Sequence, residues 1–161
     1  MQGGIQGMTG NNLDAKLADF VQAQNVVYDH VRRELAAGRK QSHWMWFIFP
    51  QLAGLGHSAM SRRFAFESLE EARRYWEHPV LGPRLRECIE LVLGCGQHDP
   101  HAIFGSPDDL KFRSSMTLFA QAMPQERLFQ TALDRFFGGQ PDPRTLALLG
   151  KSAGSDVPQT G

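Results

Sequence analysis

The sequence lacks the marks of several classes of protein. No apolar run approaches the roughly 18 residues of a membrane-spanning helix, and the first residues have neither the basic start nor the apolar core of a secretory signal. The 161 residues carry 17 Lys and Arg against 17 Asp and Glu, so net charge provides no general attraction to nucleic acid or to an anionic membrane. We therefore expect a cytoplasmic protein that does not bind membranes and for which nucleic acid is a disfavoured partner.

Cysteine is scarce, because the chain has only two. Cys88 and Cys95 lie on one face of a predicted helix but about 10 Å apart along its axis, which is too far for a disulfide within an intact helix. They share an apolar stripe with Leu81, Leu85 and Val92. We interpret both as small core residues, with a redox pair as the alternative.

Motifs of familiar chemistries are also missing. The sequence has no Walker loop, no HExxH, no strand-associated GxGxxG and no GxSxG elbow. His98 and His101 have helical spacing, but Asp99-Pro100 interrupts them and no further ligand or thiol is nearby in the sequence. We therefore predict no metal site and no cofactor.

What the sequence does contain is one domain with many helix boundaries. Small polar residues without periodicity predict a flexible N-terminal tail over residues 1–12 and a flexible C-terminal tail over residues 150–161, with Met8 as an alternative natural start. Residues 13–149 are predicted to form a single helical domain. We expect an all-α fold, a compact bundle of about six to eight helices.

Capping residues, glycines and prolines place the helices. A first helix runs from about Asp14 to Ala37 and ends at Gly38. Ser68 and Glu71 form a capping box that predicts the start of another helix. Three capping residues followed by proline predict further starts, at residues 99–100, 106–107 and 142–143, and Gly138-Gly139 ends a long helix. The helix after Ser106 is apolar around much of its circumference and is predicted to be central.

The most unusual segment is RKQSHWMWFIFPQ, residues 39–51, with four aromatic residues in six positions. One interpretation is a buried core element with solvated ends. The functional interpretation is a pocket wall in which Trp44 and Trp46 stack a planar ligand while Lys40, His43 and Gln51 bind its polar edges.

Two other places carry candidate residues. Gln24 falls in the apolar stripe of the first helix, so its amide needs partners, either in the protein or in a ligand. After Ser106, the acidic residues Asp108 and Asp109 fit a capping role. Lys111, Arg113 and Ser114 lie on the predicted central helix and are expected either to be paired or to face a cleft.

Five segments together resemble a known family. The sequence is similar to domain-of-unknown-function family 1810, whose bacterial and fungal members are sometimes labelled calpastatin, through FVQAQ (20–24), GRK (38–40), SHWMWFIFPQ (42–51), HPVLG (78–82) and IFGSPDDLK (103–111). The resemblance covers about residues 13–149 and implies a compact, mainly helical domain. It implies no activity, substrate or cofactor, and the chain has no inhibitor repeats that would support the calpastatin label. A fainter similarity, through Gln22-Ala23 alone, is to the NADAR N-glycosidic hydrolases.

These observations support two main hypotheses of function. The first is a domain that binds, and in one version hydrolyses, a small planar anionic or nucleotide-derived ligand in an aromatic-lined pocket. Its ligand-binding residues are Gln24, Lys40, His43, Trp44, Trp46, Gln51, Arg113 and Ser114, and its candidates for catalysis are His43, Asp108 and Lys111. The alternative is a non-catalytic protein–protein interaction domain that exposes the aromatic segment, with a NADAR-like hydrolase as the weaker alternative. Whether the protein is an enzyme is open at this stage.

Overall fold

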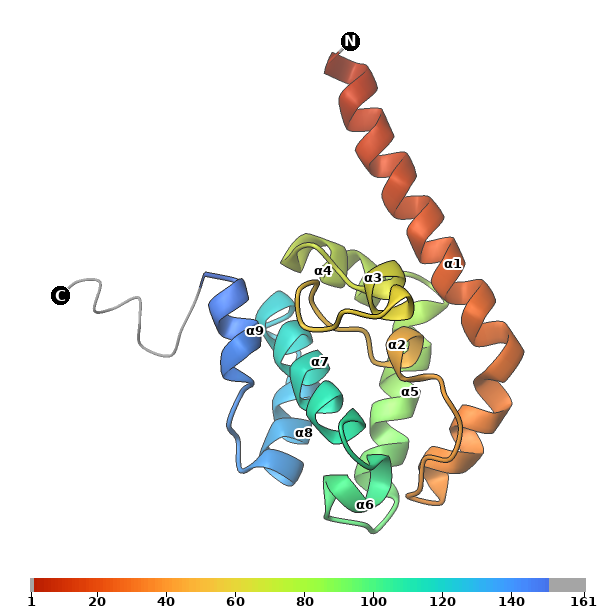
Figure 1. Ribbon diagram of the computed structural model, residues 1–161, viewed down its shortest axis with the longest axis vertical. Coiled ribbons are helices and arrows are strands. Elements are labelled where there is room, and N and C mark those ends of the chain that lie inside the picture. The colour runs from red at the N-terminus through yellow and green to blue at the C-terminus, as the bar shows by residue number, and fades with distance from the viewer. Residues whose placement is uncertain (1, 151–161) are drawn as a thin grey trace, which may run out of the picture.

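The computed structural model describes residues 2–150, with the side chains of residues 12–150, and this part of the chain is all-α (Figure 1). Its nine helices are α1 (Gln2–Ala36), α2 (Met45–Ile48), α3 (Ala59–Phe64), α4 (Leu69–Glu77), α5 (Leu81–Gly94), α6 (Pro100–Phe104), α7 (Asp108–Ala122), α8 (Leu128–Phe137) and α9 (Pro143–Leu148). The all-α prediction is confirmed. The number exceeds the expected six to eight because short helices such as α2 and α3 were not anticipated.

Most of the predicted helix boundaries are confirmed. Gly38 follows α1 with a φ of 71°, a conformation that favours glycine. The Ser68 hydroxyl accepts a hydrogen bond from the backbone N–H of Glu71 and so caps α4. The carboxylates of Asp99 and Asp142 cap α6 and α9, each followed by proline as expected.

Two helix starts differ from the prediction. α1 begins at Gln2 rather than near Asp14, and residues 2–13 contain no proline, which would have interrupted the helix. The flexibility expected for residues 1–12 stays a prediction, and residues 151–161 lie outside the described part. α7 begins at Asp108, and Ser106 does not cap it; the Asp109 carboxylate accepts from the backbone N–H of Leu110 in the first turn instead.

Helix α7 lies at the centre of the packing, as its apolar circumference predicted. It contacts α4, α6, α8 and α9, while α5 packs against α1, α4 and α8. In Figure 1 the N-terminal part of α1 projects beyond the rest of the molecule, and α9 lies on the opposite side from the C-terminal part of α1. The side chains of Phe112, Met116, Leu118 and Phe119 are fully buried on α7.

The core is rich in aromatic side chains from segments far apart in the sequence. Phe20 of α1 lies with its ring centroid 5.0 Å from that of Phe64 and 5.1 Å from that of Tyr75. Between α3 and α4, Phe66 pairs with Leu52 in an isolated parallel bridge. Such contacts join α1, the 44–66 region and α4 into one core.

Within the described residues, no helix combines the length and the apolar character needed to cross a bilayer.

Candidate functional site

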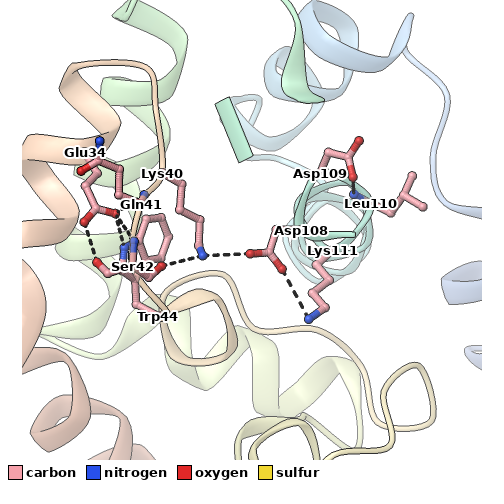
Figure 2. Close-up of polar contacts among 9 residues, drawn as sticks. All are labelled: Glu34, Lys40, Gln41, Ser42, Trp44, Asp108, Asp109, Leu110 and Lys111. Carbon is pink, nitrogen blue, oxygen red and sulfur yellow. Dashed lines mark hydrogen bonds and ion pairs between the residues drawn. The ribbon is translucent and has the colours of Figure 1, made fainter. Parts of the chain in front are cut away.

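The loop that precedes α2 is tied to the first turn of α7 by Lys40. Its ammonium nitrogen lies 2.9 Å from Asp108 Oδ2 and donates to the carbonyl oxygen of Ser42 over 2.6 Å. The other carboxylate oxygen of Asp108 lies 3.4 Å from Lys111 Nζ. Figure 2 shows Asp108 between the two lysines, with Lys40 reaching it from the loop and Lys111 from α7. Asp108 is therefore shared by two cations.

The carboxylate of Glu34, on α1, holds the loop that precedes α2. It accepts from the backbone N–H groups of Gln41 and Ser42, the Ser42 hydroxyl and the indole N–H of Trp44 (Figure 2). Burial alone would raise the pKa of Glu34, but these donors outweigh it and lower the pKa to about 2. The carboxylate stays ionised at neutral pH and fixes residues 41–44.

Most of the aromatic segment lies inside the protein. Trp44 is fully buried, and Phe47 and Phe49 are 6% and 1% exposed. The Trp44 ring lies 5.0 Å from the ammonium of Lys40, and its N–H is bound by Glu34. These rings are therefore core residues, which was the first of the two interpretations of the segment. Trp46 is partly exposed, with the ammonium of Lys111 5.4 Å from its ring centroid.

Four of the predicted site residues line one groove of about 460 Å³, here called the α7–α9 groove. They are Gln51, Lys111, Arg113 and Ser114. The rest of the lining comes from Leu55, Pro107, Leu110, Asp142, Pro143 and Arg144. The groove thus joins three segments: the loop at 51–55, the first turns of α7, and the start of α9.

Side chains of α7 hold the segment that leads into α9. Arg113 donates to the carbonyl oxygens of Gln140 and Pro141, both over 3.0 Å. Ser114 donates to Asp142 Oδ2 over 3.1 Å. The same Asp142 oxygen accepts from the backbone N–H and the hydroxyl of Thr145. These bonds fix one wall of the groove, and three donors stabilise the negative charge of the Asp142 carboxylate.

Two polar groups of the groove have no partner among the described residues. Arg144 is exposed and makes no hydrogen bond or ion pair there, and the same holds for the side-chain amide of partly exposed Gln51. Both are open to a ligand. Arg144 and Asp142 were not predicted from the sequence as site residues, although Asp142-Pro143 was recognised as a helix start. The signal that could have identified Arg144 is its position as a cation directly after this Asp-Pro pair.

Six predicted site residues do not line the groove: Lys40, Trp44, Trp46 and Asp108, described above, together with Gln24 and His43. Gln24 is 1% exposed, and its amide donates to the carbonyl of Phe47 over 2.7 Å and to the hydroxyl of Tyr75 over 2.9 Å. Its oxygen accepts from Arg84 over 3.3 Å, so protein groups provide its bonds. His43 is exposed and does not line the groove.

The cysteines differ from each other in their surroundings. Cys88 is buried, and burial raises the pKa of its thiol to about 12, which keeps it protonated and poorly nucleophilic. Cys95 is only partly buried, follows the last residue of α5 and packs against the edge of the core rather than inside it. Within residues 12–150, no group of three or more His, Cys, Asp or Glu side chains is arranged to hold a metal ion.

Comparison with known proteins places this chain in a family. Among solved structures, the conserved hypothetical protein Rv1873 from Mycobacterium tuberculosis shares 51% identity, with a TM-score of 0.82 over 84% of this chain and 97% of that chain. No curated protein matches significantly. The model of the family described as "Protein of unknown function (DUF1810)" matches residues 14–149, most of the described part of the chain. The chain therefore belongs to the DUF1810 family, as the resemblance of its sequence predicted.

Proposed function

We propose that this protein binds a small anionic ligand in the α7–α9 groove, and that it does so in the cytoplasm, where free thiols such as Cys88 and Cys95 persist. One observation carries the proposal: Lys111, Arg113 and Arg144 converge on the groove, where Asp142 has the only lining carboxylate among the described residues. The volume of about 460 Å³ suits a small molecule.

The three cations contribute in different ways. Arg144 is free of protein partners among the described residues and is the group best placed to pair with a phosphate or carboxylate. Lys111 and Lys40 both pair with Asp108. Lys40, which does not line the groove, therefore already neutralises part of the charge of this carboxylate. The Gln51 amide adds both a donor and an acceptor.

The geometry supports binding better than hydrolysis. Asp108, a candidate base, is paired with two ammonium groups, and His43 does not line the groove. A general base must reach the proton that it removes. The interaction hypothesis loses its aromatic surface because Trp44, Phe47 and Phe49 are buried. A protein partner at another surface stays a prediction, as does the planar or nucleotide-derived nature of the ligand.

The proposal is tested by calorimetric titration of the full chain with inorganic phosphate, AMP, ADP-ribose and glucose 6-phosphate. At least one should bind, and Arg144→Ala should weaken that binding about tenfold through loss of a charge-assisted contact. Arg127→Ala is the matched control, because Arg127 is also exposed but lies before α8 and outside the groove. Equal losses in both variants would indicate general surface charge, and no binding by any anion would overturn the proposal.

A further inference from the structure

An exposed apolar side chain, that of Leu110, lies in the same groove. Among the described residues, three large hydrophobic side chains are exposed: Val26 at 80%, Leu110 at 57% and Leu148 at 50%. Leu110 lines the α7–α9 groove. Leu148 lies against the loop at 51–55, since a Cβ added to Gly54 would be 3.4 Å from Leu148 Cδ1. Leu110 therefore belongs to the groove, Leu148 lies beside the loop that forms part of it, and Val26 lies on α1.

The groove has an apolar part beside its charged part. Leu55, Pro107, Leu110 and Pro143 provide apolar lining, next to the cations of Lys111, Arg113 and Arg144. The exposure of Leu110 also corrects an expectation, because this residue lies on the helix predicted to be mostly covered. Exposing the Leu110 side chain to water is unfavourable, and an apolar group that covers it removes this free-energy cost.

The apolar lining is aliphatic. Within the described part of the chain, no Phe, Tyr or Trp side chain lines the groove, and the ammonium of Lys111 lies 5.4 Å from the ring centroid of nearby Trp46. Nucleobases gain affinity by stacking on aromatic rings, whereas alkyl groups pack well against leucine and proline. The lining therefore favours an aliphatic group over a base.

We infer that the ligand of the α7–α9 groove is an amphipathic small molecule, a phosphate monoester or carboxylate attached to an aliphatic chain. The inference rests on the proposed function and specifies the class of ligand. The anionic group pairs with Arg144 and Lys111, and the chain lies against Leu110 and Leu55. The volume of the groove limits the ligand to a small molecule rather than a folded partner.

The test compares n-hexyl phosphate, inorganic phosphate and AMP by calorimetry with the full chain, at concentrations where hexyl phosphate is monomeric. Hexyl phosphate should bind at least about tenfold more tightly than inorganic phosphate, because several methylene groups leave water. Leu110→Ser should remove most of that advantage, measured in the same variant as the ratio of its affinities for hexyl phosphate and inorganic phosphate. Val26→Ser, which changes an exposed apolar residue of α1, should alter neither affinity.

The outcomes separate the two proposals. If phosphate binds through Arg144 but hexyl phosphate binds no better, or if AMP binds more tightly than hexyl phosphate, the aliphatic ligand class is wrong and the anion site stands. The same conclusion follows if Leu110→Ser keeps the full advantage of the chain. Absence of binding by all three compounds overturns the aliphatic ligand class, and the proposed function is overturned as well when ADP-ribose and glucose 6-phosphate also fail to bind.

Discussion

The ammonium nitrogen of Lys40 lies 2.9 Å from the carboxylate of Asp108, and the two side chains are only 7% and 19% exposed. Together they join the loop after α1 to the start of α7. Because water barely reaches the pair, each charge depends on the other for its solvation. The pair therefore belongs to the framework of the groove, although Lys40 does not line it.

Removal of either member should be costly, and removal of both should cost less than the sum of the two single losses. Lys40→Met leaves Asp108 with Lys111 alone and should lower the free energy of unfolding by about 2 kcal/mol. Asp108→Asn should also destabilise, and the double variant should lose less than the sum of the two. Arg63→Met, which breaks an exposed pair with Asp19, should cost less than about 1 kcal/mol. Urea unfolding measures all four, and strict additivity at Lys40 and Asp108 would refute the coupling.

Glu34 should make the fold sensitive to strong acid. Its pKa of about 2 lies below the ordinary 4.5, so the stabilisation is present above pH 4.5 and is lost as the pH falls from 4.5 toward 2. Glu34→Gln should be less stable at pH 7 and should show a flatter stability profile over that range. Glu77→Gln, at an exposed position, is the control and should keep the wild-type profile. The measurement is urea unfolding followed by tryptophan fluorescence, and an unchanged slope in Glu34→Gln contradicts the assignment.

His78 should add a second pH dependence, nearer neutrality. Its Nδ1 accepts from the backbone N–H groups of Val80 and Leu81, so the neutral ring caps the start of α5. Burial lowers the pKa of His78 below 6.5, with Asp14 partly opposing. The unfolded chain therefore binds a proton more readily, and stability, complete above pH 6.5, should fall as the pH drops below it.

The His78→Asn variant tests this assignment, because asparagine can also accept from the freed N–H groups without titrating. Its free energy of unfolding should decline less between pH 7 and pH 5 than that of the wild type. His57→Asn, at an exposed position, serves as the control and should retain the wild-type decline. Identical pH profiles for His78→Asn and the wild type would show that the cap does not titrate.

Gly82 should tolerate no side chain. A Cβ added there would lie 2.0 Å from the backbone carbonyl oxygen of Trp76, where α4 meets α5. Gly82→Ala should therefore destabilise by at least about 3 kcal/mol, although alanine is the better helix former. Gly94→Ala in the same helix meets nothing within 4 Å and should be neutral or slightly stabilising. Thermal unfolding of the two variants distinguishes them, and similar melting temperatures would contradict the close approach.

Gln24 should matter for stability rather than for binding. Gln24→Ala leaves the carbonyl of Phe47 and the hydroxyl of Tyr75 without this partner in the core and should cost about 3 kcal/mol. Gln22→Ala, on the exposed side of α1, should change stability by less than about 0.5 kcal/mol. Ligand affinity measured well below the melting temperature should be unchanged in both. A selective loss of affinity in Gln24→Ala would instead support the role first expected from the sequence.

Local chemistry explains why the helices could be placed from the sequence. Gly38, Asp99-Pro100 and Asp142-Pro143 each act through their own backbone or the next turn, so their effect does not depend on distant partners. Ser106 is the exception, because α7 starts at Asp108 with no side-chain cap from it. The α7 stripe also predicted its central place, since a helix apolar on most sides must be covered.

The candidate site could be predicted only in part. Lys111, Arg113 and Ser114 were recognised because charged and polar groups on a covered helix need a partner or a cleft. The structure shows both, since Lys111 and Arg113 have partners and all three residues line the groove. Trp44 and Lys40 looked equally suited to a ligand. The sequence around an aromatic ring or a cation does not show whether the side chain packs inside or faces solvent. Only the fold shows that the side chains of Trp44 and Lys40 are buried.

The sequence by itself determined the all-α class, the family and most helix ends, because these depend on periodicity, on capping and on motifs carried by short segments. Only the tertiary structure decided that the aromatic segment is core, that Gln24 bonds to Phe47 and Tyr75, and that Lys40 neutralises Asp108. It also brought Gln51, Lys111 and Arg144 to one groove. Those relationships join residues far apart in the chain, and their energies come from burial and charge pairing, which no local pattern encodes.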